Sequence, residues 1–373
     1  MTLVFFCNYL NHHQVYVADE MYRLLGEDFR YVATKPCDSR QLKGGEDYSS
    51  RSYCIMAAES DEAHSRALGF AENADVCVFG ACSQEYAVRR AVRNPGGLAF
   101  EMGERWLKRG ALNILSPVLC SWWLNYRRYY RKANFYKLCS GAFVSADDER
   151  LGCYKDRHFK WGYFPALSDL EQLRNKDNAV KILWCARLIS WKHPEMPLQL
   201  AGKLKNGGYK FHINIVGDGE LRSQLEKLIS EYEIADCVTL LGNLPNVQVL
   251  KTMSESDVFL FTSDRMEGWG AVLNEAMSAG CCVVANKAIG SVPYLIKGQE
   301  TGLTYNGSIG SLYSKVKYLL DYPEDCKRIG KNAHRYIQQV WSPTNAARSL
   351  LTLVEELSAG RDTNITEGPC SKA

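Results

Sequence analysis

Two glutamates, Glu267 and Glu275, flank a Gly-Trp-Gly stretch and an apolar run in the segment EGWGAVLNEAMSAG. Apolar residues at 272–277 follow helical spacing, which places Glu267 in a loop before a helix and Glu275 within that helix. The glycines Gly268 and Gly270 let backbone N–H groups approach a ligand, and the helix N-terminus favours an anion such as a phosphate. The two carboxylates can therefore share one ligand site, or Glu275 can be an ordinary exposed helical residue.

Strand-like and helix-like patterns alternate along the chain and must position this segment. In the first half, apolar runs of strand length occupy residues 2–7, 75–80, 98–101 and 141–146. In the second half, they occupy residues 180–188, 211–220, 237–242, 257–263 and 281–286. This alternation is typical of parallel α/β sheets, which bind ligands beyond the carboxyl ends of their strands. The loops ARLISWKH, GDGE and TSDRMEGWG are therefore expected on one rim.

Length and composition limit the class of protein. A chain of 373 residues is expected to form two domains, because one domain usually takes about 150 residues. The net charge of +3 does not indicate nucleic-acid binding. The fourteen cysteines lack the spacing of a metal site, which favours a reduced, cytosolic protein. The opening residues MTLVFFCNYL are expected to form a strand and not a signal peptide, and no apolar run is long enough for a transmembrane helix.

The segment EGWGAVLNEAMSAGCCVVA resembles the E-x7-E segment of the retaining glycosyltransferases of family four. Four further segments resemble the same family and occur in its order: ILWCARLISWKH, INIVGDGELRSQLEKL, VTLLGNLP and SDVFLFTSDRMEGWG. Together they extend over roughly residues 180 to 345, so chance is a poor explanation. The resemblance implies the α/β fold called GT-B, in which two Rossmann-like, doubly wound domains face each other across a cleft.

The resemblance also implies a site for a UDP- or GDP-sugar donor, with no cofactor and no metal. Arg187 and Lys192 would bind the diphosphate and neutralise the charge that grows on the leaving nucleoside diphosphate. Glu267 would contact the donor sugar, and Glu275 would accept hydrogen bonds from the ribose hydroxyls. Backbone groups would complete the site at Gly268, Trp269, Gly270, Asn243 and Leu244. The family usually has a glycine after the lysine, whereas this sequence has His193.

The first half resembles, more loosely, a subgroup of the family that acts in the biosynthesis of cell-surface (capsular or exo-) polysaccharides. Its loop NHHQ follows the first strand, so His12 and His13 are expected at the carboxyl edge of the sheet, where neutral histidine can orient an acceptor hydroxyl. We prefer His13 as a catalytic candidate; the alternative is that one of the two caps the next helix. Glu101 and Glu104 are candidates to accept the acceptor proton, although Glu104 can equally pair with Arg105.

Residues 105–137 combine cations with aromatic rings and contain no acidic residue. The cations are Arg105, Lys108, Arg109, Arg127, Arg128, Arg131, Lys132 and Lys137. Rings at headgroup level and cations against phosphates are typical of contact with an anionic membrane surface, and the stretch also suits a lipid-pyrophosphate acceptor. Two alternatives stay open: nucleic acid as the partner, and an aromatic core with solvated cations.

The sequence thus predicts a retaining glycosyltransferase that moves a hexose from a nucleotide diphosphate sugar to a lipid-linked or polysaccharide acceptor. The alternatives are a nucleotide-sugar epimerase or hydrolase of the same fold, and a non-catalytic nucleotide-sugar-binding protein. No nucleic-acid partner is expected. We expect the protein in the cytoplasm, peripheral at the inner face of the cell membrane.

The predicted boundaries follow from the same patterns. Residues 1–165 are expected to form an acceptor-binding Rossmann-like domain, and residues 180–340 a nucleotide-sugar-binding one, joined by a linker at 166–179. Residues 341–358 are expected to form a helix that packs back on the first domain. The polar residues 359–373 are expected to be disordered.

Overall fold

The structure is a computed structural model that describes residues 1–36, 47–168 and 179–373. The linker predicted at residues 166–179 falls largely outside these ranges, because residues 169–178 are not among the described ones. Within the described ranges, no helix combines the length and the apolar character that crossing a membrane requires.

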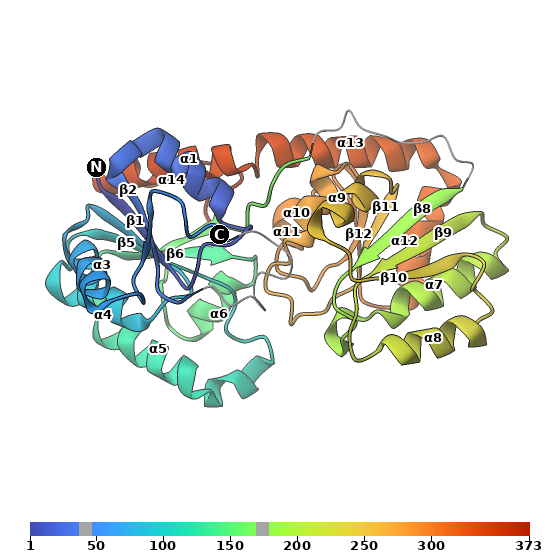
Figure 1. Ribbon diagram of the computed structural model, residues 1–373, viewed down its shortest axis with the longest axis horizontal. Coiled ribbons are helices and arrows are strands. Elements are labelled where there is room, and N and C mark those ends of the chain that lie inside the picture. The colour runs from blue at the N-terminus through green and yellow to red at the C-terminus, as the bar shows by residue number, and fades with distance from the viewer. Residues whose placement is uncertain (37–46, 169–178) are drawn as a thin grey trace. The chain divides into compact units, whose positions relative to one another are not determined.

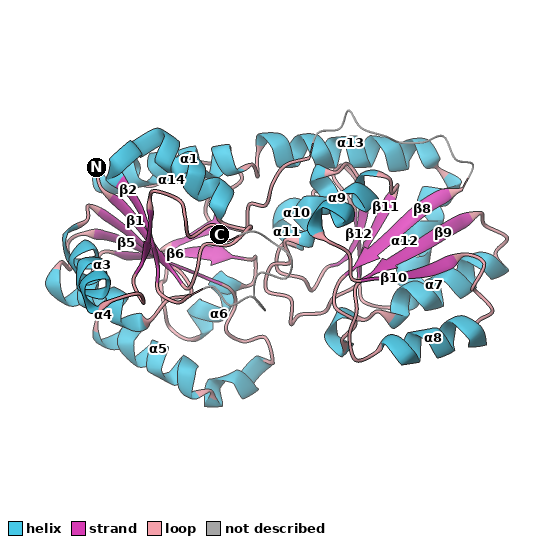
Figure 2. Cartoon of the chain, viewed as in Figure 1, coloured by secondary structure: helices cyan, strands magenta, loops and turns pink. Residues whose placement is uncertain are grey.

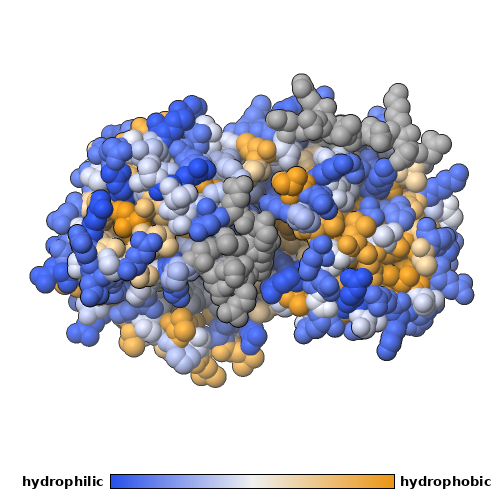
Figure 3. Space-filling view, in the orientation of Figure 1, coloured by the Kyte–Doolittle hydropathy of each residue, from blue (hydrophilic) through white to orange (hydrophobic). Residues whose placement is uncertain are grey.

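The chain divides into two compact units (Figure 1). Unit 1 comprises Met1–Ala166 together with Val340–Ala373, and unit 2 comprises Leu167–Gln339. Each unit is built on one parallel sheet with helices packed on its faces (Figure 2), and hydrophilic side chains cover most of the visible surface (Figure 3). The two units are therefore separate α/β domains of the Rossmann-like, doubly wound type, as predicted.

Unit 1 contains a sheet with the strand order β3-β2-β1-β4-β5-β6-β7, in which all neighbours are parallel. Its strands are β1 (Leu3–Cys7), β2 (Phe29–Ala33), β3 (Cys54–Met56), β4 (Val76–Phe79), β5 (Leu98–Gly103), β6 (Phe135–Ser140) and β7 (His158–Trp161). Every residue of β1 and β4 is buried, as expected for strands covered by helices on both faces. The order reverses between β1 and β4, so the loops that follow these strands lie side by side.

Helices of unit 1 come from both ends of the chain. They are α1 (Val15–Leu25), α3 (Asp61–Asn73), α4 (Gln84–Arg93), α5 (Pro117–Arg128), α6 (Val144–Arg150) and α14 (Pro343–Ser358), with 3-10 turns η1 (Gly26–Asp28), η2 (Gly110–Leu115) and η3 (Tyr130–Lys132). Ser342 caps α14 by accepting a hydrogen bond from the backbone N–H of Asn345 (3.1 Å). This last helix packs against α1, so the end of the chain completes unit 1 (Figure 1).

One strand of unit 1 lies before the place where the sequence predicts it. The apolar run at residues 141–146 is not a strand: β6 occupies Phe135–Ser140, and the chain then turns into α6. Lys137 interrupts the apolar run FYKLCS and so conceals the strand from a periodicity argument. Lys137 is nevertheless 1% exposed, because its ammonium pairs with Glu101 on the neighbouring strand β5.

The prediction of a disordered tail at residues 359–373 is wrong. The backbone N–H of Lys160 in β7 donates to the carbonyl of Ser371, and the N–H of Cys370 donates to the carbonyl of Lys160, both at 2.7 Å. The side chain of Cys370 is fully buried. Polar composition does not reveal this order, because it depends on backbone hydrogen bonds to β7 and on contacts such as the Lys372–Asp362 ion pair.

Unit 2 contains a parallel sheet with the strand order β10-β9-β8-β11-β12-β13. Its strands are β8 (Val180–Cys185), β9 (Phe211–Val216), β10 (Val238–Gly242), β11 (Val258–Phe261), β12 (Cys282–Asn286) and β13 (Leu303–Tyr305). The first five coincide with the predicted apolar runs, whereas β13 is too short to be predicted. The order reverses between β8 and β11, which brings the loops after these two strands together.

The helices of unit 2 connect these strands. They are α7 (Glu195–Asn206), α8 (Arg222–Glu231), α9 (Asn246–Ser254), α10 (Val272–Ser278), α11 (Val292–Leu295), α12 (Ile309–Asp321) and α13 (Pro323–Gln339), with the 3-10 turn η4 (Ser190–Lys192). The core between sheet and helices is aliphatic and includes Ile182, Ile213, Leu260 and Val284, each at most 1% exposed. The loops that carry the predicted site residues lie at the carboxyl edge of this sheet.

Candidate functional site

The carboxyl ends of β8 and β11 carry most of the predicted site residues of unit 2. The two strands pair directly, and side-chain hydrogen bonds join the loops that follow them. Trp184 Nε1 donates to Thr262 Oγ1 (2.7 Å), and the Thr262 hydroxyl donates to the backbone carbonyl of Lys192 (2.7 Å). The loop after β8 is therefore held against the end of β11.

Lys192 and Glu267 are 75 residues apart in the sequence and form an ion pair at this edge. Each side chain is only 12% exposed. The Lys192 ammonium lies 4.3 Å from the centroid of the Trp191 ring, a cation–π contact that helps to orient it. The structure thus brings together the residue predicted to bind a diphosphate and the residue predicted to contact a sugar.

Arg187 begins the same loop and has an exposed side chain. The backbone beside it is fixed, because the N–H of Leu188 donates to the carbonyl of Asp218 (3.0 Å) and the N–H of Leu221 donates to the carbonyl of Leu188 (3.1 Å). Among the described residues, the Arg187 guanidinium forms no ion pair. A fixed backbone with a free guanidinium is suited to an anionic ligand.

His193 occupies the position where the family usually has a glycine, and its backbone explains that preference. Its φ is +53°, in the left-handed region that glycine adopts at no steric cost and that histidine also tolerates. The ring is held by Glu195 (3.1 Å) and lies 3.5 Å from Asp264, and the hydrogen bond to Glu195 raises the pKa of His193. The loop therefore keeps the conformation that a glycine would give it.

Hydrogen bonds and side-chain packing fix the conformation of the Gly-Trp-Gly loop. The Trp269 ring is fully buried and its Nε1 donates to Asn274 Oδ1 (2.9 Å), while its carbonyl accepts from the Ser291 hydroxyl (2.6 Å). A Cβ on Gly270 would lie 2.3 Å from the Phe261 ring, and φ at this glycine is +84°. Consequently the backbone path after Glu267 has little freedom.

Two backbone donors of this loop remain open. Within the described part of the chain, the N–H groups of Gly268 and Gly270 donate to no protein acceptor. The loop therefore presents donors beside the Glu267 carboxylate, as a site for an oxygen-rich ligand requires.

Glu275 lies in α10, as its spacing predicts. Burial raises the pKa of its carboxyl to about 7, and no cation offsets this effect. In the described residues, its carboxylate takes part in no hydrogen bond or ion pair. A half-buried acid with no hydrogen bond or ion pair among the described residues is consistent with a role toward a ligand hydroxyl. Glu275 is therefore not an ordinary exposed helical residue.

Asn243 and Leu244 directly follow β10. Asn243 is exposed and Leu244 is half-buried. Since β10 is separated from β8 by β9, these residues lie at the same edge of the sheet but further from Lys192.

Unit 1 has a cavity of about 510 Å³ at the carboxyl ends of β4, β5 and β6. Its lining combines aromatic rings with polar groups, including Glu101, Glu104, Trp106, Trp122, Ser140 and Tyr163. Two polar atoms of the residues that line it, Trp106 Nε1 and Ser140 Oγ, are buried and have no hydrogen-bond partner among the described residues. Aromatic surfaces beside unsatisfied donors can receive a ligand with both C–H and O–H groups, such as a sugar.

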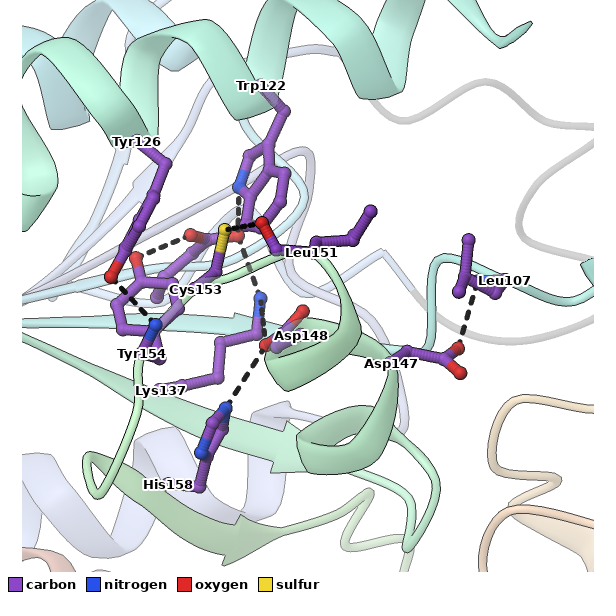
Figure 4. A network of polar contacts seen from close by, with 11 residues as sticks. Leu107, Trp122, Tyr126, Lys137, Asp147, Asp148, Leu151, Cys153, Tyr154 and His158 are labelled. Carbon is purple, nitrogen blue, oxygen red and sulfur yellow. Dashed lines mark hydrogen bonds and ion pairs between the residues drawn. The ribbon is translucent and has the colours of Figure 1, made fainter. Parts of the chain in front are cut away.

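Glu101 is the centre of a buried polar network, whose hydrogen-bond donors Trp122, Lys137 and Tyr154 are labelled in Figure 4. Its Oε1 accepts hydrogen bonds from Trp122 Nε1 (2.7 Å) and Lys137 Nζ (2.8 Å), and its Oε2 accepts one from the Tyr154 hydroxyl (2.7 Å). Asp148 lies 4.0 Å from Lys137 on the other side of the ammonium. Three donors already hold the Glu101 carboxylate, so an acceptor hydroxyl would have to bind beside them.

The charges of this network depend on one another. Burial by itself would lower the pKa of Lys137, but the carboxylates of Glu101 and Asp148 outweigh it and raise the pKa above its ordinary value. Burial raises the pKa of Asp148, which Lys137 and His158 partly counteract. The ammonium therefore stays charged and holds two acidic groups in the interior.

Tyr163 connects two predicted residues of unit 1. Its ring stacks on His13, with centroids 5.5 Å apart and planes 7° apart, and its hydroxyl donates to Glu104 Oε1 (2.8 Å). The N-cap position of helix α1 is occupied by Gln14 and not by either histidine. Sequence spacing could not indicate the role of Tyr163, because it lies about 150 residues beyond the histidines.

Glu104 does not pair with its neighbour Arg105. Its Oε2 accepts from Lys108 Nζ (2.6 Å), four residues along the chain. Arg105 instead forms two hydrogen bonds of 3.0 Å to the carboxylate of Asp147. The alternative of a Glu104–Arg105 ion pair is therefore wrong, because a buried carboxylate in α6 takes the guanidinium.

Comparison with known families identifies the second unit. Residues 168–336 match the family model described as "Glycosyl transferases group 1". This match covers most of unit 2 and includes Arg187, Lys192, Glu267 and Glu275. The family resemblance inferred from the rim loops is confirmed.

Curated relatives share part of the sequence. The amylovoran biosynthesis glycosyltransferase AmsK of Erwinia amylovora is 29% identical over 185 residues, covering 48% of this chain and 45% of the relative. The putative colanic acid biosynthesis glycosyltransferase WcaL of Escherichia coli is 31% identical over 128 residues, covering 33% of this chain and 31% of the relative. The matches thus span less than half the length of these relatives.

Solved structures share the whole fold. Anabaena HepE, crystallised with UDP and glucose, superposes with a TM-score of 0.66 at 15% identity, covering 96% of this chain and all of that one. Sucrose-phosphate synthase from Thermosynechococcus elongatus gives a TM-score of 0.64 at 14% identity with the same coverage. At such identity the likeness concerns the fold alone, and it confirms the predicted GT-B class.

Proposed function

Because the chain contains a glycosyl transferases group 1 domain within a GT-B fold, we propose that it is a retaining glycosyltransferase that moves a hexose from a nucleotide diphosphate sugar to a lipid-linked or polysaccharide acceptor. One observation carries this proposal: Lys192, Glu267 and Arg187 converge at the point where the strand order of unit 2 reverses. Open α/β sheets bind nucleotides at this point.

The donor is proposed to bind with its diphosphate between Arg187 and Lys192. In the free protein the Lys192 ammonium pairs with the Glu267 carboxylate, so an incoming diphosphate would replace this carboxylate as the anion beside the ammonium. Glu267 then becomes available to the sugar hydroxyls, and Glu275 to the ribose. The Anabaena neighbour was also crystallised with UDP-glucose, which supports a UDP-sugar as the first donor to test, with a GDP-sugar as the alternative.

Transfer with retention follows from attack on the face that the leaving group departs from. The bond from the anomeric carbon to the phosphate oxygen breaks as the bond to the acceptor oxygen forms, through an oxocarbenium-like state. The acceptor proton passes to the departing phosphate oxygen. Arg187 and Lys192 stabilise the charge that develops there, a role that a metal ion fulfils in other enzymes.

The acceptor is proposed to be a growing cell-surface glycan. The names of AmsK and WcaL link these relatives to amylovoran and colanic acid biosynthesis, which supports a role in polysaccharide assembly here. We propose that the acceptor sugar enters the cavity of unit 1, where Trp106 Nε1 and Ser140 Oγ have no hydrogen-bond partner in the part of the chain that the structure describes. His13 and Glu101 remain the catalytic candidates on this side, and the protein is proposed to act at the inner face of the cell membrane.

Release of nucleoside diphosphate in the presence and absence of acceptor tests this function. The purified chain is incubated with UDP-glucose, UDP-galactose and GDP-mannose, with and without membrane extract as the acceptor source. A transferase releases nucleoside diphosphate only when acceptor is present. Release without acceptor identifies a hydrolase, a changed free sugar nucleotide identifies an epimerase, and tight binding without turnover identifies a non-catalytic binding protein.

A further inference from the structure

Five large apolar side chains are exposed close together on η2 and α5. They are Leu112, Ile114, Leu115, Val118 and Leu124, with exposed fractions of 73%, 50%, 81%, 63% and 59%. We call this surface the apolar ledge. Apolar side chains are visible at the lower edge of the molecule in Figure 3, where α5 lies in Figure 1. A cluster of this kind on a soluble surface marks an interaction site, since single exposed apolar residues are common but groups are not.

Exposed cations flank the apolar ledge in the sequence, one before η2 and four at the end of α5 and in η3. They are Arg109, Arg127, Arg128, Arg131 and Lys132, which we call the basic rim. Among the described residues, none of the five forms an ion pair, and no acidic residue occurs anywhere from Arg105 to Ala146. Arg127 and Arg128 lie over the rings of Trp123 and Tyr129, at 5.4 and 5.3 Å from the centroids. The rim is therefore a positively charged surface that lacks internal neutralisation.

The residues that the structure exposes for membrane contact differ from those that the sequence pattern predicts. The rings of Trp122, Tyr126 and Tyr130 are at most 6% exposed and belong to the core of unit 1. The pattern of residues 105–137 predicts that these rings lie among lipid headgroups. Their burial shows that this prediction is wrong for these three rings. Arg105 and Lys137 are likewise turned inward to Asp147 and Glu101. Aliphatic side chains, and not these aromatic ones, form the exposed apolar part.

We propose that the apolar ledge and the basic rim dock on an anionic lipid bilayer. The ledge supplies aliphatic side chains that enter the acyl boundary, and the rim supplies cations for the phosphate headgroups, the combination that holds amphipathic segments in the interface. A second copy of this chain is a poorer occupant, because the same surface would meet its own positive charge. The absence of acidic residues matches a partner that is uniformly negative.

Docking in this way would bring the cavity of unit 1 to the headgroup region. Val118 belongs to the apolar ledge, is 63% exposed, and also lines the cavity. The lining of the cavity therefore extends to the apolar ledge. Trp106 and Lys108, close to η2 in sequence, line the same cavity. This step rests on the proposed function: a sugar carried by a membrane lipid could enter the cavity while its lipid stays in the bilayer. The acceptor class favoured by the surface is therefore lipid-linked.

Co-sedimentation with vesicles tests the docking surface directly. The full chain is mixed with sucrose-loaded vesicles of phosphatidylcholine, or of phosphatidylcholine with phosphatidylglycerol. We expect binding to the anionic vesicles that weakens with salt, since each cation at an anionic surface strengthens binding about fivefold. The double variant Leu112→Ser, Leu115→Ser should bind at least tenfold more weakly. Its matched control is Val247→Ser, an equally exposed apolar residue of unit 2 (79%), which should bind like the unchanged protein.

Substitution of the cations of the basic rim separates the electrostatic contribution to vesicle binding from the apolar contribution of the ledge. The variant Arg127→Gln, Arg128→Gln, Arg131→Gln, Lys132→Gln should lose its preference for anionic over neutral vesicles. Failure of the unchanged chain to bind anionic vesicles overturns the proposal, as does equal binding by the Leu112→Ser, Leu115→Ser variant and the Val247→Ser control. Light scattering that shows a dimer lost only in the Leu112→Ser, Leu115→Ser variant would also overturn it, because another copy would then cover the ledge.

Failure of this inference is distinguishable from failure of the proposed function. Vesicle binding needs no donor, so Lys192→Ala should bind vesicles normally while losing transfer. Conversely, the Leu112→Ser, Leu115→Ser variant should keep its affinity for UDP, since neither leucine lies in unit 2. A chain that transfers sugar but ignores vesicles contradicts the docking surface alone.

Discussion

Units 1 and 2 both collect charged residues at the carboxyl edge of a parallel sheet, but they hold them in opposite ways. In unit 2 the charges lie in loops: Arg187 has no ion-pair partner among the described residues, and Lys192 pairs with Glu267 of another loop. In unit 1 the cation Lys137 lies on a strand, is 1% exposed, and sits between the carboxylates of Glu101 and Asp148. Loop charges with few partners can exchange them for a ligand, whereas a buried cation with two partners holds the fold together.

Removal of the Glu267 carboxylate is the strongest test of the claim that the loop charges of unit 2 bind a ligand. We expect Glu267→Ala to reduce acceptor-dependent release of nucleoside diphosphate below detection, because the sugar then loses its carboxylate contact. The fold should persist, since the Gly-Trp-Gly loop is fixed by Asn274 and Ser291. Asp236→Ala is the matched control: it removes a carboxylate from an exposed pair with Lys205 in the same unit and should leave turnover unchanged.

Loss of the Lys137 ammonium is the corresponding test in unit 1. We expect Lys137→Met to lower the free energy of unfolding by about 3 to 5 kcal/mol, because two buried acids lose their cation. Denaturant unfolding measures this change, with the exposed Lys132→Met as control and an expected effect within about 0.5 kcal/mol. A loss below about 1 kcal/mol for Lys137→Met would show that the network is not a structural anchor.

Arg187 should affect the reaction and not the fold. We expect Arg187→Ala to lose about 2 to 4 kcal/mol of transition-state stabilisation, the scale for one preorganised charge donor. The ratio of kcat/KM values reports this loss, and unfolding should be unaffected because the side chain is exposed. Arg328→Ala, in a surface pair with Asp325, serves as the control. Near-normal kcat/KM for Arg187→Ala would remove this residue from the site.

The smallest predicted effect is a pH dependence of donor binding. The pKa of Glu275 is about 7, and only its carboxylate form accepts hydrogen bonds with both oxygens. Affinity for UDP-glucose should therefore rise with pH, by up to about tenfold between roughly pH 6 and pH 8. UDP-glucose is the suitable probe because its diphosphate does not titrate in this range. In Glu275→Gln this part of the pH dependence should vanish, and its persistence would show that another group titrates.

The sequence predicts the fold of unit 2 better than that of unit 1, for a physical reason. Every residue of β11 and β12 is buried, as are the three central residues of β8, so these strands read as apolar runs. Strand β6 contains Lys137, whose burial depends on partners on β5 and α6 that no local pattern shows. The order of residues 359–373 depends in the same way on a distant strand, β7.

The site shows the same division between local and distant information. The rim loops identify Arg187, Lys192 and Glu267 as candidates because their residue types and order are local features. The ion pair between Lys192 and Glu267 follows only from the strand order, which brings β8 beside β11. The bond from Tyr163 to Glu104 likewise joins two distant segments. Which charges are free and which are occupied could therefore be read only from the structure.

Thermal unfolding in the presence of UDP tests the central claim that the edge of unit 2 is the donor site. At a UDP concentration 100 times its Kd, the unchanged protein should gain about 2.7 kcal/mol of stability, and Lys108→Ala, which breaks a lysine–glutamate pair in unit 1, should gain the same. The double variant Arg187→Ala, Lys192→Ala should gain almost none at that concentration. Equal stabilisation of this double variant and the unchanged protein would contradict the account, because the nucleotide would then bind elsewhere.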